Sequence, residues 1–281
     1  MRKIVGAWHG TCHHPLKIRS MKLSIVPLIV ISVLVSCTKN NEDPGKGTAS
    51  MSIYLTDDPS PYDKVYIDIQ SVEVNVSSDS SGEGWVELPM TRRGVFNLLH
   101  LRNGLDTLIA SGILPAGKIS QLRLVLGPDN SVVVGGVSFP LETPSAQQSG
   151  LKLLLNTELT PGIDYKVWTD FDAAKSIVTT GNGKFLLKPV IRVYTKATTG
   201  SIAGMVLPAT ADAWIYALSG TDTIASAKPD SLAGNFLIQG LDAGTYSIAV
   251  NGLNNYNDTL LTNIEVNTGA VTNTGTITLH Q

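Results

Sequence analysis

The sequence predicts an all-β protein of two tandem β-sandwich domains behind an export leader. Apolar residues alternate with polar ones in many short runs, which is the period of a half-buried strand. Gly, Pro, Asn and Ser break these runs at short intervals, and helical periodicity is scarce. The clearest alternating positions are Met51, Ile53, Leu55, Val65, Ile67, Ile69, Val72, Val74, Val76, Leu122, Leu124 and Leu126.

The chain begins with a predicted signal peptide over residues 1–36. Met21 is followed by Lys22 and then by a 13-residue apolar run from Leu23 to Val35. A helix needs about 20 residues to cross a bilayer, so cleavage explains the run better than a membrane span. Because Met21 starts a complete leader by itself, we interpret residues 1–20 as a misassigned start.

A cysteine ends this leader. Leu34-Val35-Ser36-Cys37 resembles the lipobox of bacterial lipoproteins, and the resemblance implies a diacylglycerol on the sulfur of Cys37. An ordinary signal peptide with a chance cysteine is the alternative. Thr38 follows the cysteine where an Asp would retain a lipoprotein in the inner membrane, so we expect an outer-membrane lipid anchor, facing the periplasm or the outside.

Charge and residue counts narrow the function. Without residues 1–36 the chain carries 16 Lys and Arg against 23 Asp and Glu, a formal charge of −7. Nucleic-acid binding needs clustered basic residues, so we exclude that class. Cys37, His100 and His280 are the only cysteine and histidines left, which argues against disulfides, zinc clusters and Cys-His nucleophiles. We therefore predict that the protein is not an enzyme.

After a polar, lipidated tether over residues 37–48, the first sandwich is expected over 49–196. The apolar phase changes by one residue between Ile69 and Val72, which a bulge at Gln70-Ser71 would absorb. Residues 97–110 could form one or two short helical turns. Further strands are predicted over 132–134, 151–155, 165–171 and 184–194, and Gly181-Asn182-Gly183 predicts a hairpin.

A small, polar boundary at residues 196–200 separates a second sandwich, predicted over 197–281 with seven short strands. Here Ala213, Ile215 and Ala217 alternate with Trp214 and Tyr216, so the two aromatic side chains share the opposite strand face.

Motifs over residues 50–195 resemble the domain of unknown function 4382 family of bacterial lipoproteins. They include Leu55-Thr56-Asp57-Asp58-Pro59, Asp170-Phe171-Asp172-Ala173-Ala174-Lys175-Ser176 and Leu187-Lys188-Pro189-Val190. The family carries no established activity, so the resemblance implies none. The second module resembles the carboxypeptidase regulatory-like sandwich, of prealbumin or starch-binding type, through Gly234-Asn235-Phe236 and Leu241-Asp242-Ala243-Gly244-Thr245-Tyr246. That resemblance implies a spacer or binding unit that does not catalyse.

Four carboxylates form one candidate site. Asp170 and Asp172 share a strand face, and Asp57 with Asp58 could join them as calcium ligands or as a pair of catalytic acids. The structural alternative is a local ion pair between Asp172 and Lys175, with Asp57-Asp58-Pro59 as a turn. A hydrolase would require all four carboxylates to converge in one pocket.

Trp214 and Tyr216 form the other candidate site, which Tyr256 could extend. Paired exposed rings suit stacking against sugar rings, whereas packing against the first sandwich is the alternative. His100 is expected to be partly buried rather than catalytic. The sequence thus predicts a non-catalytic cell-envelope lipoprotein that binds glycan or serves for display. The alternatives are an accessory subunit or spacer for an outer-membrane protein, and a metal- or carboxylate-dependent hydrolase.

Overall fold

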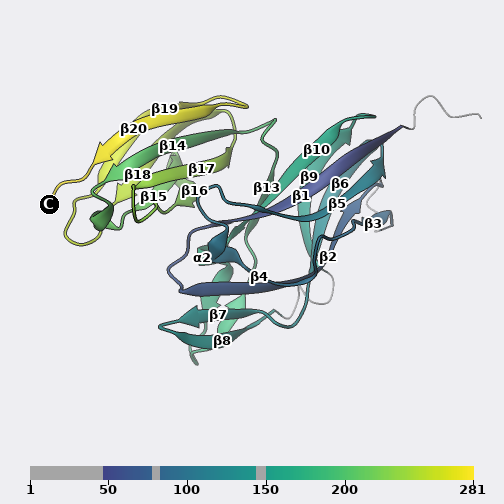
Figure 1. Ribbon diagram of the computed structural model, residues 1–281, viewed down its shortest axis with the longest axis horizontal. Helices are drawn as coiled ribbons and strands as arrows, with labels where there is room; N and C mark the ends of the chain where they lie inside the picture. The colour runs from purple at the N-terminus through teal and green to yellow at the C-terminus, as the bar shows by residue number, and fades with distance from the viewer. Residues whose placement is uncertain (1–46, 78–82, 144–149) are drawn as a thin grey trace, which may run out of the picture. The chain divides into compact units, whose positions relative to one another are not determined.

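The computed structural model describes residues 47–77, 83–143 and 150–281. The predicted signal peptide, the predicted lipidation site Cys37 and nearly all of the predicted tether lie outside the described residues. Within the described ranges, no helix is both long and apolar enough to cross a membrane. The predicted all-β sandwich fold is confirmed, because almost all of the regular structure is strand (Figure 1).

The first sandwich is built from two sheets. The smaller sheet has the order β13-β10-β1-β5. Its strands are β1 (Thr48–Asp58), β5 (Thr107–Pro115), β10 (Asp164–Asp172) and β13 (Ile191–Tyr194). The larger sheet has the order β11-β12-β8-β7-β2-β6-β9, with β3 and β4 also paired to β2. Its strands are β2 (Lys64–Asn75), β3 (Trp85–Glu87), β4 (Gly94–Asn97), β6 (Gly117–Leu126), β7 (Ser131–Val134), β8 (Val137–Glu142), β9 (Leu151–Leu159), β11 (Ile177–Thr179) and β12 (Phe185–Leu187).

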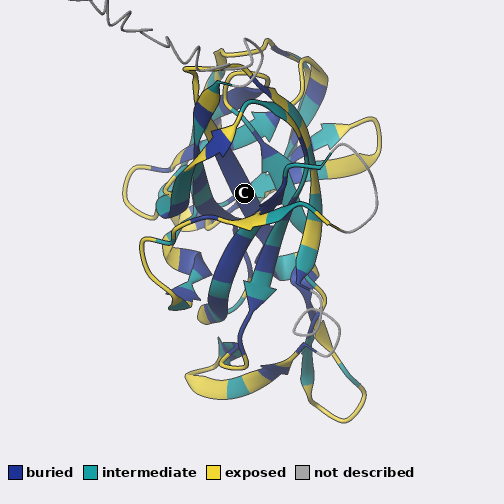
Figure 2. Ribbon diagram, turned by 90° about the vertical axis from the view of Figure 1, so that its right-hand side faces the viewer, coloured by how far each residue is buried: buried dark blue, intermediate teal, exposed yellow. Residues whose placement is uncertain are grey.

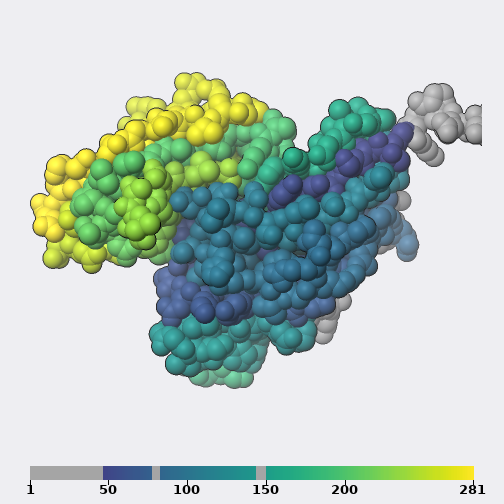
Figure 3. All heavy atoms as spheres, in the orientation of Figure 1, coloured from purple at the N-terminus to yellow at the C-terminus, as the bar shows by residue number. Residues whose placement is uncertain are grey.

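Seven strands form the second sandwich, as the sequence predicts. One sheet has the order β17-β14-β20 and the other β16-β15-β18-β19. The strands are β14 (Gly200–Leu207), β15 (Trp214–Ser219), β16 (Asp222–Ala227), β17 (Asn235–Leu241), β18 (Gly244–Asn251), β19 (Thr259–Val266) and β20 (Val271–Thr278). In the space-filling view, the yellow atoms of β19 and β20 form part of the outer surface of this sandwich (Figure 3).

Each sandwich has its own apolar core. The first core joins buried side chains between Ala49 and Leu187, and the second joins those between Ile202 and Leu279. The two cores lie on either side of the boundary predicted at residue 196, although the described residues of both sandwiches fall within a single compact unit. Along many strands, buried positions alternate with more exposed ones, as period-two sequences require (Figure 2).

The predicted bulge in β2 is present. The pairing of β2 with β6 shifts register between Ile69 and Ser71. Both Ile69 and Val72 are buried, so the extra residue keeps the two apolar sets on the core side. The hairpin predicted at Gly181-Asn182-Gly183 also forms, because β11 and β12 pair antiparallel on either side of it.

Two expectations about secondary structure were wrong in part. Residues 184–194 form two strands, β12 and β13, which belong to different sheets. Pro189 lies between them, and proline cannot donate to a ladder, so the chain leaves one sheet there. Of the helical turns expected over 97–110, only the 3₁₀ turn η1 (Leu98–His100) forms. Leu108 and Ile109 belong instead to β5, which pairs with β1.

Candidate functional site at the junction of the two sandwiches

The four predicted aspartates do meet, at the parallel ends of β1 and β10. The register of this pair places Thr56 opposite Asp170 and Asp58 opposite Asp172. Asp57, Asp58, Asp170 and Asp172 are each 4–6% exposed. Parallel strands bring their carboxyl ends to the same edge, so two acidic motifs more than 100 residues apart become neighbours. The turn expected at Asp57-Asp58 was wrong, since both residues belong to β1.

Arg192 supplies a cation to this cluster. It lies on β13 directly opposite Asp170, and its guanidinium bonds the Asp170 carboxylate. The same Nη2 atom lies 3.6 Å from Asp58 Oδ1. We call these four aspartates together with Arg192 the junction cluster. Arg192 was not predicted, because it sits in a short strand without a recognisable motif. The useful signal was its position, a charged residue between Ile191 and Val193.

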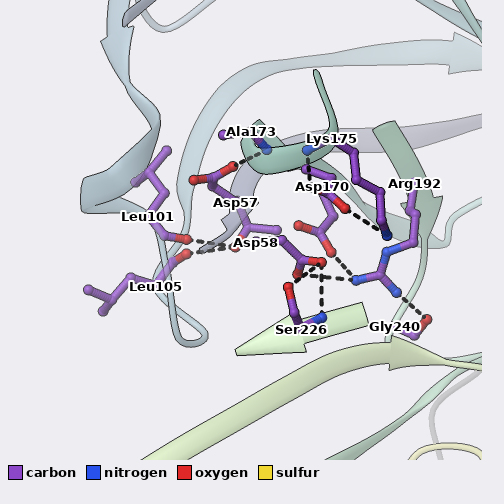
Figure 4. Close-up of polar contacts among 12 residues, drawn as sticks. Asp57, Asp58, Leu101, Leu105, Asp170, Ala173, Lys175, Arg192, Ser226 and Gly240 are labelled. Carbon is purple, nitrogen blue, oxygen red and sulfur yellow. Dashed lines mark hydrogen bonds and ion pairs between the residues drawn. The ribbon is translucent and has the colours of Figure 1, made fainter. Parts of the chain in front are cut away.

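The junction cluster also bonds the second sandwich. Asp58 Oδ2 accepts hydrogen bonds from the Ser226 backbone N–H at 3.1 Å and from its hydroxyl at 3.4 Å. Arg192 Nη1 donates to the Gly240 carbonyl at 3.3 Å. Figure 4 shows these contacts converging on Asp58 and Arg192 from the strands of both sandwiches. Ser226 lies on β16, an edge strand, so its N–H can point away from the ladder toward the first sandwich.

The other two carboxylates are held within the first sandwich. Asp172 is the N-cap of the short helix α2 (Ala173–Ser176), where its Oδ1 accepts from the Lys175 N–H at 2.9 Å. Its Oδ2 lies 3.0 Å from Lys175 Nζ, so the local ion pair predicted from sequence is present. Asp57 Oδ1 accepts from the Ala173 N–H at 3.2 Å, whereas its Oδ2 is buried without a hydrogen-bond partner.

Burial and crowding keep protons on this cluster. Removal from water raises the pKa of Asp57 well above its usual 3.8, and the charges of Asp170 and Asp58 add to the effect. Desolvation and the nearby Asp170 charge raise the pKa of Asp58 to about 8, although Arg192 opposes the shift. The pKa of Asp170 is also raised by its burial, against the stabilising charge of Arg192. Asp57, Asp58 and Asp170 therefore retain their protons to higher pH than exposed aspartates do.

The space beside these carboxyls is small. A cavity of about 20 Å³ is lined by residues that include Asp57, Asp58, Asp170 and Tyr194. This volume accommodates about one water molecule. Asp172 does not line this cavity, so the convergence of all four carboxylates in one pocket that a hydrolase would require is not met. The cavity also leaves no room for a sugar or peptide. Among the described residues, no group of three or more His, Cys, Asp or Glu side chains is arranged to hold a metal ion, so the geometry gives the calcium hypothesis no support.

A second, larger hollow lies beside the junction cluster. Trp214 and Tyr216 project from β15 on one face, while Ala213, Ile215 and Ala217 are buried in the second core on the other. Both rings are half-buried and line a groove of about 390 Å³. From the first sandwich the groove is lined by Pro59, Pro61, Asp172, Ala174 and Lys175, and from the second also by Thr223 and Ser226. Asp172, a member of the junction cluster, and Ser226, which bonds Asp58, both line this groove.

The remaining candidates lie elsewhere. Tyr256 packs against the second core and is not among the residues that line the aromatic groove, so it does not extend that surface. His100 is exposed at the end of η1, which corrects the expectation that it is partly buried. Its side chain lines a different hollow, of about 340 Å³, together with Arg102 and Asp230.

A family profile described as "Domain of unknown function (DUF4382)" matches residues 48–189, which span β1 to β12 and half of the chain. The chain belongs to this family. All four junction-cluster carboxylates lie in the acidic motifs within the matched segment, but the segment ends before Arg192. No protein among curated sequences matches the chain.

Solved structures show only distant likeness. The Bacillus anthracis TIE protein is 11% identical with a TM-score of 0.23; the match covers 83% of this chain and 34% of that protein, so the chain spans about a third of its length. The minor pilin GBS52 of Streptococcus agalactiae is 10% identical with a TM-score of 0.21, and the match covers 82% of this chain and 95% of that protein. The shaft pilin SpaA of Lactobacillus rhamnosus GG is 10% identical with a TM-score of 0.20, and the match covers 83% of this chain and 97% of that protein. Scores this low carry no argument about function.

Proposed function

We propose that this DUF4382 protein is a non-catalytic, lipid-anchored protein of the cell envelope that binds carbohydrate in the groove beside Trp214 and Tyr216. The observation that carries the proposal is the pair of half-buried rings on one strand face, lining a hollow of about 390 Å³. Ligand sites usually combine a concave shape of roughly 300–1,000 Å³ with aromatic walls and a few polar groups.

The chemistry of the groove suits a sugar. The faces of pyranose rings carry C–H groups that pack on aromatic rings, and their hydroxyls need hydrogen-bond partners. Partial burial raises the pKa of the Tyr216 hydroxyl above its usual value near 10, so the hydroxyl stays protonated and can donate. Asp172, Lys175 and Ser226 add charged and hydroxyl groups at the rim. Lys228 Nζ lies 4.8 Å from the centre of the Trp214 ring and restrains it.

A glycan array probed with the purified protein tests this proposal, in the presence of calcium and again with a chelator. We expect binding that the double variant Trp214→Ala, Tyr216→Ala weakens by on the order of tenfold or more, as for buried aromatic anchors of other interfaces. Trp85→Ala is the matched control. Trp85 is also half-buried beneath a cation, with Arg123 Cζ 4.2 Å from its ring centre, but lies on β3 away from the groove.

Two outcomes of this experiment would change the proposal. If the native protein bound no glycan under either condition, carbohydrate binding would be wrong. If chelation abolished binding, the calcium hypothesis for Asp57, Asp58, Asp170 and Asp172 would return despite the geometry. Equal losses in the groove variant and in Trp85→Ala would indicate a general loss of folding.

An accessory subunit or spacer for an outer-membrane protein is the second candidate. It is favoured by large apolar side chains on the outermost strands of the first sandwich. Ile113 on β5 is 75% exposed and Leu154 on β9 is 71% exposed. Substituting both by Ser should weaken binding to a protein partner and leave glycan binding intact. Co-purification of the partner with the native protein and with the variant measures this. The second sandwich would then be the spacer that its carboxypeptidase regulatory-like motifs suggest.

The anchor rests on the sequence alone. We propose that Cys37 carries acyl chains and places the protein at the outer membrane. Metabolic labelling with a clickable palmitate analogue should modify the native chain and not a Cys37→Ser variant. Label that persists in the variant would exclude Cys37 as the acceptor.

A further inference from the structure

Asp58, at the end of β1 in the first sandwich, accepts two hydrogen bonds from Ser226, a residue of the second sandwich that lines the groove. The groove has walls from both sandwiches: Pro59 and Pro61 follow β1, whereas Trp214 and Tyr216 lie on β15. Its width therefore depends on how firmly β1 is fixed to the second sandwich.

The strand that carries Ser226 also supports the aromatic rings. In the pairing of β15 with β16, Tyr216 lies directly opposite Ser226. Two hydrogen bonds from Ser226 to Asp58 thus connect the end of β1 to the strand beside Tyr216. Pro59 comes immediately after Asp58, so the same carboxylate lies next to a residue of the opposite groove wall.

Neighbouring groups hold the Asp58 side chain in this position. Arg192 lies within ion-pair distance of Asp58 and also bonds Asp170 and the Gly240 carbonyl. Gly240 itself packs against the Tyr194 ring, since a β-carbon at Gly240 would lie 2.4 Å from that ring. A second contact between the sandwiches does not involve the carboxylates: the Asn103 side chain bonds the backbone of Asn235 and Leu237.

We propose that Asp58 is a positioning residue for the groove: by bridging to Ser226, it fixes the wall that carries Pro59 and Pro61 against the wall that carries Trp214 and Tyr216. The proposal rests on the proposed function for its biological meaning, but the geometry that it concerns exists without any ligand. Asp58 does not itself line the groove and acts on it through Ser226. Loss of the bridge leaves the contacts of Asn103 and the Arg192–Gly240 hydrogen bond to hold the sandwiches together, so the groove widens while the chain stays folded.

Two ligand-free measurements on Asp58→Asn test this. Both are made at about pH 9, above the value of about 8 to which burial raises the pKa of Asp58, so that the native carboxylate is charged. Asn keeps the size of the side chain and one acceptor oxygen, but it lacks the negative charge that attracts Arg192. Hydrogen exchange followed by mass spectrometry should show β16 amides exchanging on the order of tenfold faster, the effect of losing one charge-assisted hydrogen bond. Spin labels on cysteines introduced at Pro61 and Thr223, one on each groove wall, should report a broader or longer distance distribution by electron-electron double resonance.

Asp63→Asn is the matched control. Asp63 is exposed, and its carboxylate also accepts a backbone hydrogen bond, from the Gly136 N–H at 2.8 Å, but at a distance from the junction. The control should leave both β16 exchange and the label distances unchanged. A second variant, Asn103→Ala, should speed exchange near Leu237 without widening the groove as Asp58→Asn does.

The outcomes separate this inference from the carbohydrate proposal. Unchanged β16 exchange and unchanged label distances in Asp58→Asn would overturn the positioning role, whether or not the native protein binds glycan. Faster exchange with a widened groove would support the positioning role even if the array showed no glycan bound, in which case only the ligand class would be wrong. Equal acceleration throughout the first core would also overturn it, because Asp58 would then act on global stability.

Discussion

The first sandwich buries two polar clusters, and they differ in how completely their groups are satisfied. The loop cluster consists of Asp68, Asn130 and Thr143, each 2–3% exposed. Asn130 accepts from the Asp68 N–H at 2.9 Å and donates to the Gly127 carbonyl at 2.7 Å and to Thr143 Oγ1 at 3.3 Å. The junction cluster is as deeply buried but contains four carboxyls, two nearby cations and an oxygen without a partner, Asp57 Oδ2.

The two clusters differ in whether their buried groups are neutral or carry like charges. The loop cluster fixes the turn between β6 and β7 with hydrogen bonds mainly among neutral groups, and buried polar groups satisfied in this way stabilise a fold. The junction cluster gathers like charges that burial penalises, and it does so where the two sandwiches meet. Perturbed ionisable groups concentrate at functional sites more often than in purely structural positions.

Removing the cation of the junction cluster should have the largest effect. Arg192→Ala leaves Asp58 and Asp170 buried without their partner, so we expect a loss of about 3–5 kcal/mol in the free energy of unfolding. Urea denaturation measures it. Arg93→Ala is the control, because its ion pair with Glu87 is about half exposed and contributes about 0–1 kcal/mol. Equal losses in the two variants would remove the distinction between buried and surface pairs.

Breaking the loop cluster should lower the free energy of unfolding by less. Asn130→Ala leaves the Asp68 N–H and the Gly127 carbonyl without their side-chain partner, which corresponds to about 1–3 kcal/mol. Because this cluster lies away from the junction, the variant should keep the groove geometry of the native protein in the spin-label measurement. A widened groove in Asn130→Ala would show that the two clusters are coupled.

The pH dependence sharpens the comparison further. The unfolded chain releases the protons of Asp57 and Asp58 near pH 4, whereas the folded chain retains them to higher pH, to about 8 for Asp58. The free energy of unfolding should therefore fall as pH rises from about 4 to 8, by at most about 1.4 kcal/mol per pH unit for each retained proton. Asp57→Asn, neutral at every pH, should flatten this slope in urea titrations. A native slope that rises through this window would contradict the shifted pKa values.

The smallest effect is expected at the hydroxyl of Ser226. Ser226→Ala removes the 3.4 Å contact of Oγ with Asp58 but keeps the 3.1 Å bond from the backbone N–H. A loss of about 0.5 kcal/mol follows from a single weak hydrogen bond at a half-buried site. Thermal unfolding of this variant beside Asp58→Asn compares the two contributions. If Ser226→Ala were the more damaging, the backbone bond would not carry the bridge.

Local patterns predicted the strands well, because alternation and turn residues act over a few neighbours. The bulge between Ile69 and Ser71 followed from a change of phase, and the Asn182-Gly183 hairpin from its turn chemistry. The acidic residues could be named as candidates, since carboxylates beside strand ends are visible in the sequence. The environment of these carboxylates could not be predicted. Arg192 joins them only because β13 pairs with β10, and Ser226 only because a second sandwich packs beside β1.

The helical misreading of Leu108 and Ile109 has a similar cause. Their spacing suits a helix and a strand equally, and the edge of β1 decides the outcome because it offers a partner. The split at Pro189 was visible in the sequence, since proline interrupts a ladder wherever it occurs. Tyr256 could not be placed from the sequence, because packing of its loop against the second core depends on tertiary structure.

The parallel pairing of β1 with β10 also governs when this protein can fold. β1 emerges first from the ribosome, yet its neighbour arrives only much later, with Ser50 and Asp164 separated by 114 residues. Pairings of such long sequence separation form slowly, because the intervening chain must be ordered first. Until β10 is synthesised, the earliest strand has only β5 to pair with and keeps one hydrogen-bonding edge open. Until then, the open edge of β1 is available for pairing with another chain, which favours aggregation.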